Sequence, residues 1–219
     1  MPAGSLSNGP QSPSFGTVYL LRHGVVQSLS GGKRYIGWHD LPLSDSGLQQ
    51  AADWADYFDG MGLEEICCSD LIRCRETAGI IGSRCSLEPH VLPELREVNL
   101  GAWEGRSFEA IKTRYAQAFQ ERGEHIADHR PPGGESFRDL LGRTWPVFEE
   151  VVRRLRKHTL IVTHAGVIRV LLCRLLGMPL RRLFSISQSY GALNIVDVRP
   201  QGYRLQGLNL HPLTKVPPA

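Results

Sequence analysis

Two histidines stand directly after short apolar runs, one near each end of the chain. His23 follows the run 19–22 and precedes Gly24, and His164 follows the run 160–163. A short apolar run that ends close to a glycine is typical of a buried strand. In an open α/β sheet, the carboxyl ends of the strands form the edge where ligands bind. We therefore expect the two imidazoles to meet at one edge, in a site suited to a phosphoryl group.

The segment Arg22-His23-Gly24 has residue types that can transfer such a group. A neutral imidazole nitrogen can attack phosphorus and hold the group as phosphohistidine, which divides one difficult displacement into two easier ones. The guanidinium of Arg22 offers a fixed fork of donors to phosphate oxygens. Taken alone, this tripeptide is equally compatible with a histidine that only completes a strand end.

The elements that must position these groups alternate along the chain. We expect helices at about 44–58, 69–84, 136–157 and 167–176, with Ser44 and Ser69-Asp70 as caps. The segment 98–135 breaks this rhythm and predicts a small helical cap over the site, with a helix at about 108–122. Strands are expected at about 17–22, 65–68 and 90–92, in a run that ends at His164, and in a C-terminal pair at 191–198 and 202–207. This order predicts an α/β fold, a three-layer α/β/α sandwich.

Composition sets broader limits on the chain. Its 219 residues, 42% apolar and 21% charged, are enough for one globular domain, expected at 17–219 after a disordered leader at 1–16. A net charge of +3 suits a small anionic substrate and does not by itself indicate nucleic acid. Five cysteines without a CxxC pair indicate reduced thiols, and no apolar run reaches the roughly 20 residues of a membrane span. We expect a cytoplasmic monomer or homodimer that binds neither nucleic acid nor membrane.

Five segments resemble, in order, the motifs of the histidine phosphatase superfamily, which contains the cofactor-dependent phosphoglycerate mutases. They lie at 20–24, 43–47, 69–77, 95–105 and 163–166, and the similarity spans about residues 17–198. The resemblance implies a phosphoglycerate mutase-like fold and phosphoryl transfer without a metal or another cofactor. It also implies a role for each matching residue: His23 as nucleophile, Glu97 as proton donor, His164 as a charged stabiliser of the transition state, and Arg22, Arg73 and Ala165 as phosphate-binding residues.

The position expected for Arg73 supports its role independently. It falls in the first turn of the helix at 69–84, where free amides and the helix dipole favour an anion. The acid is selected by the family pattern alone. Three carboxylates, Glu94, Glu97 and Glu104, lie close together in the sequence, and their spacing does not distinguish them.

Two other motifs have competing interpretations. Cys67 and Arg73 have the Cys-x5-Arg spacing of cysteine-dependent phosphatases, but the intervening residues include no glycine, so this reading is disfavoured. His125 and His129 are spaced like two zinc ligands on a helix, but the glutamate of the zinc-protease motif is absent. We expect no metal site there.

The residues after Gly24 depart from the family pattern. Many relatives have polar residues where this chain has Val25, Val26 and Leu29. We therefore expect substrate contacts from three residues nearby: Gln27, Arg34 and Gly37. Lys33 and Arg34 are equally compatible with an ordinary basic loop, so that alternative stays open.

The segment 131–136 is similar to that of the phosphatase branch, which includes the α-ribazole phosphatases of cobalamin biosynthesis. The resemblance thus implies hydrolysis of a small phosphorylated metabolite, with α-ribazole 5'-phosphate as the leading specific substrate. Two alternatives stay open: a phosphoglycerate mutase, and a binding protein with little or no catalysis.

Overall fold

A single mixed sheet of six strands forms the centre of the protein. The computed structural model describes residues 16–28, 32 and 34–212, so the expected leader, apart from Gly16, lies outside the described residues, as do Leu29 and Lys33. The strand order is β3-β2-β4-β1-β5-β6, with β1, β2, β3 and β4 parallel and β5 and β6 antiparallel to their neighbours. The strands are β1 Gly16–Arg22, β2 Glu65–Cys68, β3 His90–Val91, β4 His158–Thr163, β5 Leu193–Arg199 and β6 Gly202–Leu210.

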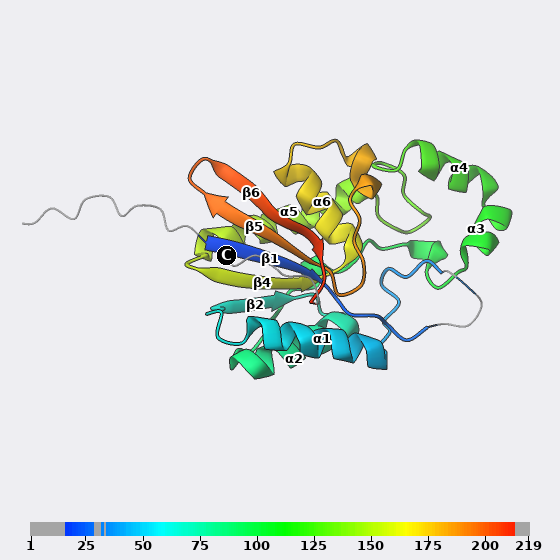
Figure 1. Cartoon of the computed structure of the whole chain (residues 1–219). Helices are drawn as coiled ribbons and strands as arrows, with labels where there is room; N and C mark the ends of the chain where they lie inside the picture. The colour runs from blue at the N-terminus through cyan, green and yellow to red at the C-terminus, as the bar shows by residue number, and fades with distance from the viewer. Residues whose placement is uncertain (1–15, 29–31, 33, 213–219) are drawn as a thin grey trace, which may run out of the picture.

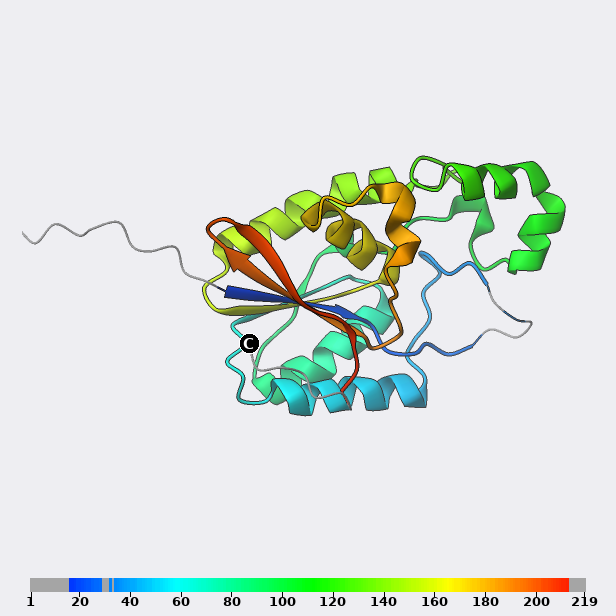
Figure 2. The same ribbon diagram turned by 45° about the horizontal axis from the view of Figure 1, so that its top comes forward.

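Helices cover both faces of this sheet. In Figures 1 and 2, α1 and α2 lie on one face and α5 and α6 on the other, which confirms the predicted three-layer architecture. The helices are α1 Asp45–Phe58, α2 Ile72–Cys85, α3 Phe108–Arg114, α4 Ala116–Glu124, α5 Phe137–Arg154 and α6 Ala165–Leu175, with 3-10 turns at Pro93–Leu95, Gly101–Trp103 and Leu180–Ser185.

The apolar run of β1 is buried on both faces of the sheet. Val18 and Leu20 pack into the core under α5 and α6, whereas Tyr19 and Leu21 pack into the core under α1 and α2. Successive side chains of a strand point to opposite faces, so a strand covered on both sides needs apolar residues throughout.

The helix starts expected at Ser44 and Ser136 are confirmed, and the start expected at Ser69-Asp70 is wrong. Ser44 caps α1 and Ser136 caps α5, each by accepting a backbone hydrogen bond from the first turn. The Ser69-Asp70 cap fails, because α2 begins only at Ile72 and its cap position, Leu71, offers no side-chain acceptor. The Ser69 hydroxyl instead accepts the amide of Leu71 and contacts His164.

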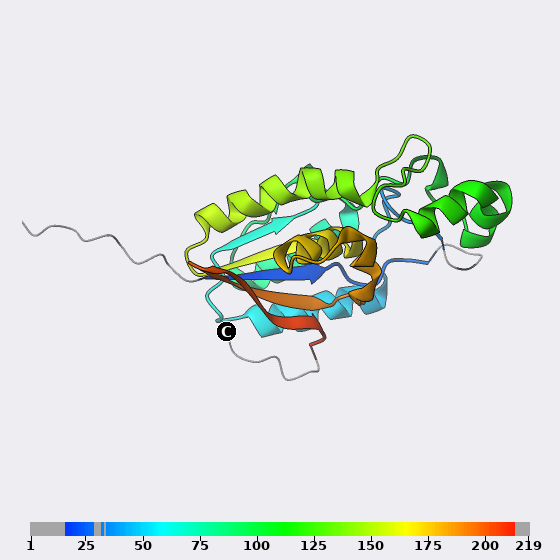
Figure 3. The same cartoon turned by 90° about the horizontal axis from the view of Figure 1, so that it is seen from above.

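The segment between β3 and α5 forms the cap. Figure 3 shows α3 and α4 beyond the carboxyl end of the parallel strands. The single helix expected at 108–122 is interrupted at Tyr115, whose φ of −129° and ψ of 45° leave the helical region, and α4 continues to Glu124. Within the described part of the chain, no helix combines the length and the apolarity needed to cross a membrane.

Candidate active site

The two strand-end histidines meet at the carboxyl edge of the sheet, as their positions predict. Strands β1 and β4 are parallel, with Arg22 opposite Thr163, so the next residue of each strand lies at the same level. The amide of His23 donates to the carbonyl of Thr163 at 3.0 Å. The ring centroids of His23 and His164 are 5.1 Å apart, and both side chains are buried.

The surroundings of His23 favour the tautomer that a nucleophile needs. Its Nδ1 lies 2.8 Å from the carbonyl oxygen of Gly24, and a carbonyl can only accept, so Nδ1 carries the proton. The lone pair of a neutral ring is then on Nε2. Burial, followed by the charges of Arg22 and Arg73, holds the pKa of His23 well below its usual value. The imidazole is therefore neutral at neutral pH.

Arg73 is fixed behind the two histidines. It is the second residue of α2 and only 1% exposed, and it donates to the carbonyls of Gly37 and His39 at 2.6 and 2.9 Å. Its Nε donates to Nδ1 of His164 at 3.3 Å. These three bonds use three of the five N–H groups of a guanidinium, which leaves two, and Nη1 also lies 3.9 Å from Oδ1 of Asp40.

His164 is neutral in the substrate-free protein. Burial, followed by the charge of Arg73, lowers its pKa well below the ordinary value, and its Nε2 lies 2.9 Å from the hydroxyl of Ser69. The charged partner expected for the phosphate therefore exists here as a neutral ring. The physical reason is that a buried imidazole beside a guanidinium gains a proton only when an anion balances the charge.

Arg22 is held by an aromatic residue that sequence reasoning missed. Its guanidinium carbon lies 3.6 Å from the ring centroid of Tyr190, and its Nη1 donates to the carbonyl of Gln188 at 2.7 Å. The ring of Tyr190 is also 5.5 Å from that of His23. No motif marks Tyr190, because it reaches the site from the segment before β5, far from both histidines in the sequence.

The buried Nε of Arg22 has no hydrogen-bond partner within the described chain. A buried donor of this kind is rare in native proteins. Burial also lowers the pKa of Arg22. This unpaired donor lies in the residue directly before His23, which makes Arg22 a candidate contact for an anion.

Of the three candidate carboxylates, Glu97 alone lines the pocket that contains Arg22. Its two oxygens accept the amides of Gly166 and Val98, each at 2.9 Å. A Cβ at Gly166 would lie 2.1 Å from an oxygen of this carboxylate, so a larger residue there would displace the Glu97 side chain from its present position. Glu94 is exposed, and the carboxylate of Glu104 accepts amides of the segment 37–39.

Arg22, Glu97 and Tyr190 border a pocket of about 450 Å³ beneath the cap, which we call the catalytic pocket. His23 lies next to it, with its ring 5.5 Å from that of Tyr190. Arg34, a predicted substrate-binding residue, lines it, and Gln27 lines an adjoining recess. Gly37 lines neither cavity, because its carbonyl binds Arg73 and its amide binds Glu104. The other pocket-lining residues form an aromatic and basic wall: Tyr35, Phe108, Phe137, Phe184 and Tyr190 with Arg122 and Arg169.

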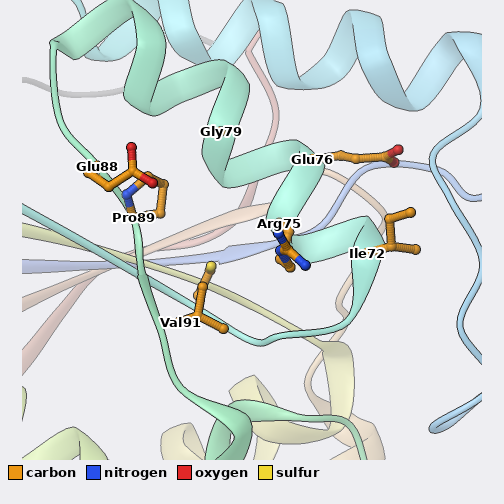
Figure 4. Close-up of a pocket in the computed structure, with 8 residues that line it drawn as sticks. Ile72, Arg75, Glu76, Gly79, Glu88, Pro89 and Val91 are labelled. Atoms are coloured by element: carbon orange, nitrogen blue, oxygen red, sulfur yellow. The ribbon is translucent and has the colours of Figure 1, made fainter.

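Cys67 and Cys68 do not line this pocket, whereas the Sγ of Cys74 lies 3.4 Å from Nε2 of His164. Burial raises the pKa of Cys67 to about 12 and that of Cys68 to about 11, so neither is a thiolate at neutral pH. Cys68 lines a separate hollow beside α2, together with Arg75 and Val91, that shares no residue with the catalytic pocket (Figure 4). Over residues 16–28, 32 and 34–212, no three His, Cys, Asp or Glu side chains are grouped as metal ligands.

Comparisons with known proteins identify relatives of this chain. The chain is 28% identical over 197 residues to an adenosylcobalamin/alpha-ribazole phosphatase of Escherichia coli, covering 88% of this chain and 95% of that protein. It is 32% identical to a probable phosphoglycerate mutase of Serratia proteamaculans over 74% of this chain and 75% of that protein. The solved structure of a mycobacterial glucosyl-3-phosphoglycerate phosphatase superimposes with a TM-score of 0.81 at 26% identity, covering 89% of this chain and 99% of that one.

The family model of the histidine phosphatase superfamily, branch 1, matches residues 18–211. That span includes the paired histidines, the two arginines and Glu97. Together with its phosphatase relatives, this match makes the protein a phosphatase of the hydrolase class. The chain belongs to the histidine phosphatase superfamily.

Proposed function

We propose that this protein hydrolyses a small phosphomonoester without a metal ion, through a phosphohistidine at Nε2 of His23. The observation that carries the proposal is the state of His23. Its Nδ1 is bound to the carbonyl of Gly24, and burial beside Arg22 and Arg73 keeps the ring neutral. The free lone pair therefore sits on the nitrogen that faces the substrate.

In the first step, Nε2 of His23 forms a bond to phosphorus while the bond to the leaving oxygen breaks. Glu97 donates a proton to that oxygen, so an alcohol departs rather than an alkoxide. The unpartnered Nε of Arg22 and the two spare N–H groups of Arg73 bind the phosphoryl oxygens. The amide of Ala165, at the start of α6, adds a further donor.

In the second step, water attacks phosphorus and Glu97 takes its proton. The bond from phosphorus to Nε2 breaks, and its electron pair returns to the imidazole. The products are inorganic phosphate and the original neutral His23. His164 takes no covalent part; beside Arg73, it stabilises the negative charge of the transition state once the phosphoryl group is bound.

The phosphohistidine itself provides the test. Rapid acid-free quenching with a labelled substrate is expected to trap protein-bound phosphate that is labile in acid and stable in base. Mass spectrometry should locate it on His23, and His23→Ala should carry none. Label on Cys67 or on His164 would reject the proposal.

The names of the relatives give α-ribazole 5'-phosphate as the specific substrate that we propose. Hydrolysis predicts release of one inorganic phosphate per alcohol formed. The second candidate, a phosphoglycerate mutase, is favoured by the 32% identity to the Serratia protein. It predicts interconversion of 2- and 3-phosphoglycerate with little phosphate release, so phosphate and product counts on the same sample distinguish the two.

A further inference from the structure

The segment that carries Glu97 has no regular secondary structure to hold it. Residues 96–100 follow the 3-10 turn Pro93–Leu95 and belong to neither a helix nor a strand. The carboxylate of Glu97 nevertheless has a defined position, because its oxygens accept the amides of Val98 and Gly166. Backbone groups outside helices and strands need other hydrogen-bond partners. The partners of this segment therefore show what fixes Glu97 in place.

Arg143 of α5 supplies three of these partners. Its Nη1 donates to the carbonyls of Glu94 and Arg96 at 2.6 and 2.8 Å, and its Nη2 donates to the carbonyl of Glu97 at 2.8 Å. One guanidinium thus binds three carbonyls in the four residues that end at the proposed acid.

Glu135 orients this guanidinium. Its two carboxylate oxygens accept Nε and Nη2 of Arg143 at 2.8 and 2.9 Å, so the pair is bidentate. All five N–H groups of Arg143 are then used, and the planar fork cannot turn without losing several bonds at once. Glu135 also binds the segment directly, because its Oε2 accepts the amide of Asn99 and its own amide donates to the carbonyl of Asn99. We call this pair the Arg143–Glu135 clamp.

The clamp lies outside the catalytic pocket. Glu97 lines that pocket, but neither Arg143 nor Glu135 does. The clamp therefore acts on the reaction through the residues that it holds. Burial and the charge of Arg73 are the main causes that lower the pKa of His164, and the charge of Arg143 adds a smaller part. A test of position must for this reason keep the charge at residue 143.

We infer that the Arg143–Glu135 clamp positions the proton donor, by holding the backbone of residues 94–99 so that the carboxylate of Glu97 meets the leaving oxygen. The inference rests on the proposed function, in which Glu97 is the acid, and adds to it two positioning residues that do not line the catalytic pocket. A misplacement of about 1 Å can lower a rate about 10²-fold. Loss of the clamp should therefore weaken proton transfer more than the other parts of the reaction.

The test compares an ester that needs the acid with one that does not. Arg143→Lys keeps the positive charge but lacks the planar fork. It is expected to lower kcat for ethyl phosphate about 30-fold and kcat for 4-nitrophenyl phosphate less than about fivefold, because only ethanol is a poor leaving group.

Arg138→Lys is the matched control. Arg138 also lies on α5 and binds one carboxylate, that of Asp128, through Nε and Nη2, but its side chain is 64% exposed. Both rates should stay within about twofold of the wild type in this variant, as is usual for an exposed ion pair.

A double variant shows whether the clamp acts through the acid. In a Glu97→Gln background, Arg143→Lys should change the ratio of the two rates less than about twofold, because the acid is already absent. A purely structural role would instead lower both rates together. An unchanged ratio in folded Arg143→Lys would overturn the inference, as would a full further loss in the double variant. Thermal unfolding identifies the folded variants, and Glu135→Gln, expected to shift the ratio about fivefold, is the second variant.

Hydrogen exchange separates this inference from the phosphatase proposal. The amide of Gly166 lies in the first turn of α6, where amides have no helical partner, and it donates to Glu97 instead. Its exchange rate therefore reports the position of the carboxylate without turnover. Arg143→Lys is expected to raise this rate at least about tenfold, and Arg138→Lys less than about twofold.

The two failures are distinguishable. If Glu97→Gln slows both esters equally, Glu97 is not the acid and the proposed function fails at that step. If Arg143→Lys leaves the exchange of the Gly166 amide unchanged, the clamp does not hold Glu97 and the inference is overturned.

Discussion

Helix α2 contributes one arginine to each of two regions, the histidine pair and the hollow in Figure 4, and the hollow is lined by arginine, glutamate and apolar residues just as the catalytic pocket is. On the inner side of α2, Arg73 is buried and bound to two carbonyls and His164. On the outer side, Arg75 is exposed. We conclude that residue types alone do not make a site. A site also needs side chains that are buried away from water and held by fixed hydrogen-bond partners.

The largest effect should separate the histidine from the cysteines. His23→Ala is expected to lower kcat for 4-nitrophenyl phosphate by about 10⁴-fold or more, because it removes the nitrogen to which the phosphoryl group is transferred. Cys67→Ser and Cys68→Ser should keep activity within about threefold. Loss of activity in a folded cysteine variant, together with activity retained in His23→Ala, would make the cysteine rather than His23 the nucleophile.

The two arginines of α2 offer the next comparison. Arg73→Lys is expected to reduce kcat/KM about 10²- to 10³-fold, since an ammonium cannot bridge His164, two carbonyls and a phosphate together. Arg75→Lys should change it less than twofold. Thermal unfolding of both variants shows whether the fold is intact, and similar activities in folded protein would remove Arg73 from the site.

The carboxylates can be compared in the same way. Glu97→Gln is expected to slow an alkyl phosphate about 10²-fold but 4-nitrophenyl phosphate less than about tenfold, because only the poor leaving group needs the proton. Glu94→Gln, on the exposed side of the same segment, is the matched control. Equal losses for both esters would reject Glu97 as the acid.

A smaller effect concerns stability and pH. The folded-state pKa values of His23 and His164 are lowered, so the unfolded chain binds more protons than the folded one below about pH 6.5. The free energy of unfolding should therefore fall as pH drops from 7 to 5.5, by up to about 1.4 kcal/mol for each ring. Urea unfolding at both pH values measures the slope, which should be shallower in His23→Gln; an identical slope contradicts it.

Chelation should have the smallest effect. Dialysis against EDTA is expected to leave kcat/KM unchanged within about 20%, since every group assigned to the phosphate is an arginine, histidine or amide. If EDTA abolished activity and an added divalent ion restored it, a metal ion would be needed for the reaction, contrary to this prediction.

The layers of the fold and the proximity of the two histidines could be predicted from the sequence alone. Apolar runs specify strands, and parallel strands end at the same edge of the sheet. Arg22 ends β1 and His23 follows it directly, while His164 directly follows β4. The parallel pairing of these strands therefore brings them to the same edge of the sheet. Ser44 could be predicted as a cap, because it acts on the amide of Gly47, only three residues away.

The contacts between distant segments could be identified only in the folded protein. The tertiary structure separated Glu97 from Glu94 and Glu104, moved Ser69 from a helix cap to His164, and brought Tyr190 against Arg22 and His23. It also turned Val25 and Val26 from a departure in a motif into the wall of a cavity. These contacts could not be predicted because burial and hydrogen-bond partners depend on which distant surfaces pack together, and the local sequence does not specify that packing.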